Sequence, residues 1–249
     1  MILSRIYPGS PESLDLDDAS SRDTLRDWYQ PTGMSVVRMN LITTIDGSVG
    51  GTDGTSHTLS NPADRRILGV IRELADVVLV GASSVRREGY LLPRHARLAV
   101  VTGSGDLTGH GFDSDVEPGR LVVLCAAASV DRLTETLGGV PAEIVTLPLT
   151  DGALSMTDVI TALRVRGMES IVCEGGPALA SQLLAADLVD ELCLSTSPVI
   201  GGSDQQLLPS GVAVDRRATL IQLLVDDASG LYARWRMGGE PTAAPPAIE

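Results

Sequence analysis

Three short segments of the sequence combine glycine with hydroxyl, acidic or proline residues, a combination that suits phosphate binding. They are Gly-Ala-Ser-Ser at 81–84, Thr-Gly-Ser-Gly at 102–105 and Glu-Gly-Gly-Pro at 174–177. Glycine lets the backbone approach a ligand because no Cβ intrudes. Pro177 is a favoured first residue of a helix, whose free N–H groups attract an anion. Each segment alone could be an ordinary turn, and none reads G-x-G-x-x-G; together they predict a nucleotide site.

The residue types that the chain lacks exclude other chemistries. All nineteen basic residues are arginines, so the sequence offers no lysine for a Schiff base, for pyridoxal phosphate or for a Walker-type phosphate loop. Three cysteines (Cys125, Cys173 and Cys193) without a CxxC pair, and three histidines, make a protein-built zinc site improbable, and no metal is expected. We expect the cysteines to be buried, reduced thiols. The formal net charge of −13 disfavours nucleic acid as a partner.

Apolar runs separated by helical patterns must position these segments. Strands are predicted at 36–42, 77–81, 98–102, 121–125, 143–147, 170–173, 191–196, 219–225 and 231–237. Helices are predicted from Pro62 through Ala75, after a cap at Ser129, from a cap at Thr157 to before Gly167, and from Pro177. This alternation predicts an α/β fold with a mainly parallel mixed sheet flanked by helices, to which the last two strands add an antiparallel hairpin. Ligands on such sheets bind at the carboxyl ends of the strands, where the glycine segments lie.

The chain reads as one folded domain with two flanking segments. Residues 1–33 are predicted as an acidic N-terminal extension, within which 9–27 could form a short surface helix. Residues 34–238 form the predicted domain, and 239–249 the predicted disordered tail. No apolar run is long enough to span a membrane and no secretory signal is evident. We therefore expect a cytoplasmic protein with no membrane partner.

Four motifs give the chain a resemblance to a known family. They are N-L-I-T-T-I-D-G at 40–47, S-N-P-A-D-R-R at 60–66, L-A-D-V-V-L-V-G-A-S-S-V-R-R-E-G-Y at 74–90, and the block at 173–202. In order and spacing they resemble the C-terminal reductase domain of the bifunctional riboflavin-biosynthesis deaminase/reductase RibD. Single-domain pyrimidine reductases look closer still, because they too lack the deaminase half. The resemblance runs from about Val36 to Met237 and implies a dihydrofolate-reductase-like fold, NADPH as hydride donor, a small-molecule substrate and a homodimer.

The resemblance also implies roles for individual residues. For the cofactor it implies contacts at Gly81, Ala82, Ser84, Arg86, Thr102, Ser104, Gly175, Gly176 and Pro177, and Glu174, which ends a buried strand beside two glycines, is expected to line the same site. Among these, 175–177 would hold the pyrophosphate, and Thr102 and Ser104 would meet the adenosine ribose and its 2′-phosphate. For the substrate it implies Asn40, Thr44, Gly47, Ser60 and Arg65. Reduction of a C=N bond needs a proton at the nitrogen, and Asp46 and Glu88 are both candidates to deliver it.

Two departures from the family pattern leave the substrate open. Ser48 follows Gly47 where the family commonly has lysine, and Glu88-Gly89-Tyr90 stands where D-N-P is common. Serine offers a neutral hydrogen bond in place of a positive charge. The first hypothesis is reduction of a 5-amino-6-(5-phosphoribosylamino)uracil-type intermediate of riboflavin synthesis. The alternatives are reduction of another heterocycle such as dihydrofolate, or a non-catalytic NADPH-binding regulatory protein.

Overall fold

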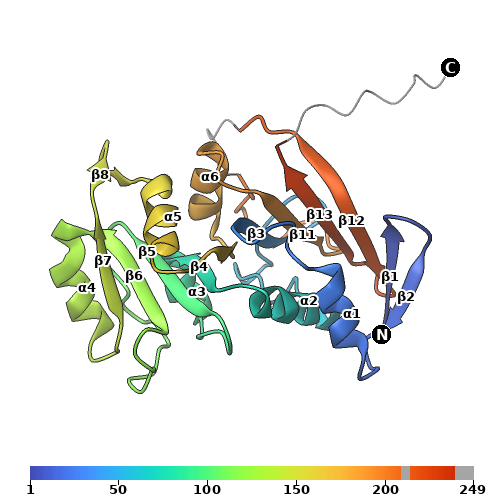
Figure 1. Cartoon of the computed structure of the whole chain (residues 1–249), viewed down its shortest axis with the longest axis horizontal. Coiled ribbons are helices and arrows are strands. Elements are labelled where there is room, and N and C mark those ends of the chain that lie inside the picture. The colour runs from blue at the N-terminus through green and yellow to red at the C-terminus, as the bar shows by residue number, and fades with distance from the viewer. Residues whose placement is uncertain (209–213, 239–249) are drawn as a thin grey trace.

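The computed structural model describes residues 1–208 and 214–238, and in them eleven strands form one sheet (Figure 1). Its order is β2 (Glu12–Asp15), β1 (Ile2–Tyr7), β12 (Ala218–Asp226), β13 (Leu231–Met237), β11 (Glu191–Thr196), β3 (Val36–Thr43), β10 (Ser170–Cys173), β4 (Val77–Gly81), β5 (Arg97–Thr102), β6 (Leu121–Ala126) and β7 (Glu143–Leu147). Every pair from β11 to β7 is parallel, and every pair from β2 to β11 is antiparallel. A separate small hairpin joins β8 (Leu149–Thr150) to β9 (Ala153–Leu154).

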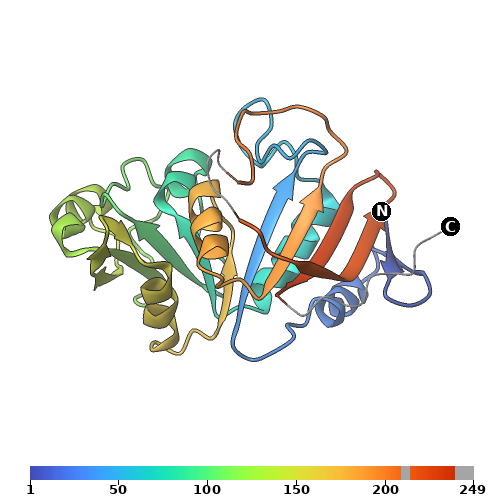
Figure 2. The ribbon, with the colours of Figure 1, turned by 90° about the horizontal axis from the view of Figure 1, so that it is seen from above.

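Helices cover both faces of the sheet (Figure 2). On one face α5 (Met156–Arg164) and α6 (Pro177–Ala185) pack on the parallel strands. On the other face lie α3 (Ala82–Glu88) and α4 (Val130–Leu137), and further along it α1 (Ser21–Trp28) and α2 (Pro62–Glu73). Successive strand residues point to opposite faces: Ile171 and Cys173 of β10 pack with the α5–α6 cluster, and Val172 packs with the α1–α2 cluster. The predicted α/β fold class is confirmed.

The central strands were predicted to within two residues at each end, but the N-terminal segment differs from the expectation. β1 pairs antiparallel with β12, with Leu3 opposite Asp226, so the C-terminal hairpin lies inside the sheet and not at its edge. Leu3, Leu16 and Leu25 are buried in the same core cluster as α2. The sequence pattern predicted neither β1 nor β2. The boundaries 34–238 of the domain remain a prediction, and the predicted tail at 239–249 lies outside the described residues.

Helix caps explain where several helices begin, and two of them correct the sequence reading. Asn61 caps α2, its side chain accepting a hydrogen bond of 2.9 Å from the Asp64 N–H. Ser155, not Thr157, caps α5. Ser129 does precede α4, but its hydroxyl donates to the Gly103 carbonyl at 2.8 Å and so does not cap the helix. A β-strand end and a helix start are thereby joined, which fixes the loop after β5.

The three cysteines are buried free thiols, as predicted. Within residues 1–208 and 214–238, no helix has the length and apolar character needed to cross a bilayer. The same residues contain no group of three or more histidine, cysteine or acidic side chains arranged to hold a metal ion.

Candidate active site

A cavity of about 370 Å³ opens at the carboxyl ends of β3, β10 and β4. Eight of the residues proposed from the sequence line it: Asn40, Ser60, Arg65, Ser84, Glu88, Glu174, Gly176 and Pro177. The other proposed residues lie outside its lining: Thr44, Asp46, Gly47, Gly81, Ala82, Arg86, Thr102, Ser104 and Gly175. The cavity therefore joins the glycine turn after β10 to residues of α2 and α3.

The glycine turn after β10 is open at the N-terminus of α6. The Gly81 N–H donates to the Gly175 carbonyl at 2.9 Å, which holds the end of β4 against the turn. Gly175 has a φ of +86°, which L side chains rarely adopt, and the peptide bond to Gly176 is cis. Gly176 precedes α6 without a side-chain cap, and a Cβ there would lie 2.9 Å from the Ser84 Oγ. An uncapped helix start beside a backbone without side chains fits a phosphate or pyrophosphate group.

Arg72, Glu174 and Tyr90 form a polar group in the cavity, in which the Glu174 carboxylate is buried and the other two side chains are partly exposed. Arg72 donates to the Glu174 carboxylate from Nε at 2.7 Å and from Nη2 at 2.6 Å. The Tyr90 hydroxyl donates to the same carboxylate and accepts from Arg72 Nη2 at 2.8 Å. Burial raises the pKa of Glu174, although Arg72 opposes that shift. Sequence reasoning did not assign Arg72, and it noted Tyr90 only as a departure from the family pattern.

Asp64 is a second buried carboxylate of the cavity that sequence reasoning missed. It lies in the first turn of α2 and accepts hydrogen bonds of 2.7 Å from the hydroxyls of Ser60 and Ser195. Burial raises the pKa of Asp64, and the two hydroxyls only partly offset this. An aspartate is common in the first turn of any helix because it complements the helix dipole. Its position in the sequence therefore carried no signal of a site.

The two acids proposed as proton donors occupy different environments. Glu88 lines the cavity and accepts a hydrogen bond of 3.0 Å from the Ser56 hydroxyl. Asp46 is exposed and accepts from the Thr44 hydroxyl at 2.7 Å and from the Gly201 N–H at 2.9 Å. These hydrogen bonds, the one from Thr44 foremost, lower the pKa of Asp46. Asp46 is thus held as an ionised acceptor that joins its own turn to the loop at 201.

Ser48, which stands in place of the family lysine, is buried outside the cavity lining with 1 % of its surface exposed. Its hydroxyl lies 2.8 Å from the Ser203 carbonyl and 2.9 Å from the Gly50 carbonyl. Its backbone N–H donates to the Thr44 hydroxyl at 2.9 Å. Thr44, Gly47 and Ser48 therefore form a tight turn that binds the loop after β3 to the segment after β11.

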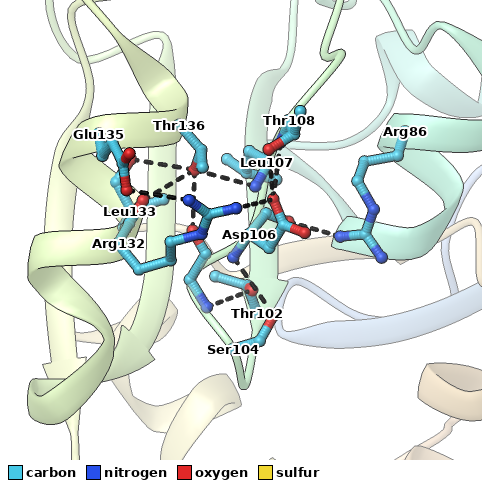
Figure 3. Close-up of polar contacts among 11 residues, drawn as sticks. Arg86, Thr102, Ser104, Asp106, Leu107, Thr108, Arg132, Leu133, Glu135 and Thr136 are labelled. Carbon is cyan, nitrogen blue, oxygen red and sulfur yellow. Dashed lines mark hydrogen bonds and ion pairs between the residues drawn. The ribbon is translucent and has the colours of Figure 1, made fainter.

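Arg86, Thr102 and Ser104 lie together at the carboxyl end of β5 (Figure 3). The buried Thr102 hydroxyl accepts from the Gly105 N–H at 3.0 Å. The Ser104 hydroxyl accepts from the Asp106 N–H at 3.2 Å, and Arg86 of α3 donates to the Asp106 carbonyl. Because β5 adjoins β4 in the sheet, this group lies on the far side of the glycine turn from β3. The structure thus arranges the proposed cofactor residues along three neighbouring strand ends.

A cavity at the carboxyl edge of a parallel sheet, beside an uncapped helix, lies where α/β proteins commonly bind small molecules. The model of the RibD C-terminal domain family matches residues 35–229. The chain therefore belongs to the RibD C-terminal domain family, as its motifs indicated.

Three known proteins illustrate this relationship. The chain is 26 % identical to 2,5-diamino-6-ribosylamino-4(3H)-pyrimidinone 5′-phosphate reductase of Methanothermobacter thermautotrophicus, over 75 % of this chain and 89 % of that protein. It is 30 % identical to riboflavin biosynthesis protein RibD of Mycobacterium tuberculosis, over 72 % of this chain but only 47 % of RibD. A pyrimidine reductase-like protein of Corynebacterium diphtheriae has the same fold, with a TM-score of 0.73 at 20 % identity over 88 % of this chain and 99 % of that one.

Proposed function

We propose that the protein is a reductase that uses NADPH to reduce the C=N bond in the ring-opened imine form of a phosphorylated ribosylamino-pyrimidinone, an intermediate in riboflavin biosynthesis. Membership of the RibD C-terminal domain family and the name of the archaeal relative support this proposal. The observation that carries it is the glycine turn at Gly176, which lies directly beside a cavity lined by carboxylates. One edge of the sheet thus offers an anion site and a proton source within one cavity.

The cofactor site in this proposal follows the strand ends. The α6 N-terminus at Gly176 and Pro177 binds the pyrophosphate beside the Ser84 hydroxyl, because the helix start has no side-chain cap and Gly176 has no Cβ to crowd that hydroxyl. The cavity takes the nicotinamide and the substrate. The adenosine end extends in the other direction, over the end of β5 at Thr102 and Ser104. When bound, the nicotinamide supplies a hydride from its C4 atom.

The chain's own residues complete the proposed reaction by holding the substrate and a proton. Reduction of an imine would require a proton at its nitrogen, which a carboxylic acid or an ordered water can supply. Of the two candidate donors only Glu88 lines the cavity, so we assign this role to Glu88. Asn40, Ser60 and Arg65 lie on the same lining and bind the substrate in this proposal. Arg65 supplies positive charge to the substrate phosphate.

Binding and turnover test the proposal separately. NADPH fluorescence is followed as the purified protein is titrated, and NADPH oxidation is then measured with the phosphorylated pyrimidinone and with dihydrofolate. We expect binding in the micromolar range and turnover of the pyrimidinone alone. Turnover of dihydrofolate alone would identify a reductase of another heterocycle. Binding of NADPH without turnover of either compound would identify a regulatory protein. If neither NADPH nor NADH binds at tens of micromolar, the proposal of a nicotinamide dinucleotide site is wrong.

The family resemblance also leads us to propose a homodimer located in the cytoplasm. Light scattering coupled to size-exclusion chromatography measures the mass directly. A single species at the monomer mass of 26.1 kDa would refute the dimer.

A further inference from the structure

A group of polar and charged side chains lies at the end of β5 (Figure 3), where the proposed function puts the adenosine end of the dinucleotide. This inference rests on the proposed function, which directs the adenosine away from the cavity and across β4 to β5. Two cationic side chains approach that place from different helices, Arg86 from α3 and Arg132 from α4. Asp106 lies between these two arginines. Neither the family resemblance nor the sequence motifs assigned a role to Asp106 or to Arg132.

The loop that carries Asp106 is fixed to α4. The Ser129 hydroxyl donates to the Gly103 carbonyl at 2.8 Å, and the Leu107 N–H donates to the Thr136 hydroxyl at 3.0 Å. A Cβ at Gly105 would lie 2.3 Å from the Ser129 carbonyl oxygen, so the loop and the helix are in direct backbone contact there. The backbone positions that carry Asp106 and Arg132 are therefore fixed relative to one another.

Asp106 is an ionised carboxylate between the two arginines. It accepts from the Thr108 hydroxyl at 2.6 Å and from the Thr108 N–H at 3.0 Å, and these hydrogen bonds lower the pKa of Asp106. Its Oδ1 lies 3.7 Å from Nη2 of Arg132, whose Nη1 donates to the Glu135 carboxylate at 2.9 Å. Arg86 donates to the backbone carbonyl of Asp106. Two guanidinium groups and two carboxylates thus leave this cluster with no net formal charge.

We infer that Asp106 is a specificity-determining residue that weakens selection of NADPH over NADH. The ribose 2′-phosphate carries between one and two negative charges at neutral pH, whereas the 2′-hydroxyl of NADH carries none. A site that prefers the phosphate needs a surplus of positive charge, and Asp106 and Glu135 cancel that of Arg86 and Arg132. The protein therefore binds NADPH and NADH with dissociation constants within about tenfold of one another.

Dissociation constants for NADPH and NADH, measured by nicotinamide fluorescence on the same preparations, test this inference. Asp106→Asn keeps an oxygen for Thr108 and removes the charge, so NADPH should bind about tenfold tighter at low salt while NADH is unchanged. That gain should shrink as salt is added. Arg132→Gln should weaken binding of NADPH alone. Asp158→Asn removes an equal charge from α5, on the opposite face of the sheet, and should change neither constant.

The outcomes separate this inference from the proposed function. A wild-type preference for NADPH above about a hundredfold, or an unchanged ratio in Asp106→Asn, would overturn the role of Asp106 and leave the reductase proposal intact. Failure of the wild type and all variants to bind either dinucleotide would overturn both. Asp106 retains 36 % of its side-chain exposure, so its replacement should leave the fold intact, which circular dichroism checks.

Discussion

A methyl group added at Gly176 tests the proposed position of the pyrophosphate. Gly176 has a φ of −66° and a ψ of −172°, which alanine adopts without strain, so Gly176→Ala should fold. The new Cβ would lie 2.9 Å from the Ser84 Oγ and would stand in the space that the phosphate needs. Hydrogen bonds to a charged group contribute about 1.5–3 kcal/mol each, so losing one should weaken NADPH binding roughly 10- to 150-fold. Fluorescence titration measures this change.

Two controls separate a collision with the cofactor from a local disturbance. Gly69→Ala adds a methyl group inside α2, where nothing lies within 4 Å, and should leave NADPH affinity unchanged. Ser84→Ala in the Gly176→Ala background removes the hydroxyl that the new Cβ meets. If this double variant binds NADPH as the wild type does, the loss came from Ser84. If Gly176→Ala itself binds normally, the glycine turn is only a turn and the cofactor lies elsewhere.

Further predictions concern the proton donor, the substrate phosphate and acid stability. Glu88→Gln should lower kcat by about a hundredfold or more and leave the dissociation constant for NADPH unchanged; a kcat near that of the wild type would exclude Glu88 as the donor. Arg65→Ala should raise KM for the phosphorylated pyrimidinone and spare NADPH binding; the same KM would place the phosphate elsewhere. Burial alone would raise the pKa of Asp226, but hydrogen bonds from Tyr232, Gly230 and Asn61 outweigh it and lower the pKa below 3.8. The ionised carboxylate therefore stabilises the fold above pH 3.8, and this stabilisation is lost as the pH falls through the lowered pKa. In urea unfolding, Asp226→Asn should have a lower free energy of unfolding than the wild type at neutral pH, and this free energy should fall less as the pH is lowered. An equal fall in both proteins would show that Asp226 does not contribute to acid stability.

The parallel half of the sheet was predictable because its strands carry their own signal. Strands buried on both faces read as continuous apolar runs, and every residue of β6 is buried. β1 carries no such signal: only Leu3 of its six residues is buried. It becomes a strand by pairing with β12, more than two hundred residues along the chain. A reading of local patterns has no access to that partner.

The candidate site likewise contains residues that the sequence predicted and residues that it did not. The glycine turn was predictable because two glycines and a proline between an apolar run and a helical pattern mark a strand that ends and a helix that begins. Arg72 was not, because an arginine on a helix usually faces solvent, and its partner Glu174 is 102 residues distant. That ion pair forms only when the end of β10 meets α2. The chemistry of the cavity is therefore set by contacts that no single motif contains.

The burial of Ser48 bears on what the cavity can bind. Because this residue is 1 % exposed and lies against Ser203, a lysine introduced there would have to displace the 203 segment before it reached a ligand. Restoring the family residue alone would not restore its charge to the cavity. Of the arginines that line the cavity, Arg72 is paired with Glu174, and Arg87 donates to Gln205 at 2.6 Å. Because Glu174 neutralises Arg72 and Gln205 holds Arg87, Arg65 of α2 is the arginine of the lining that we propose for a substrate phosphate, and it is the decisive position to vary.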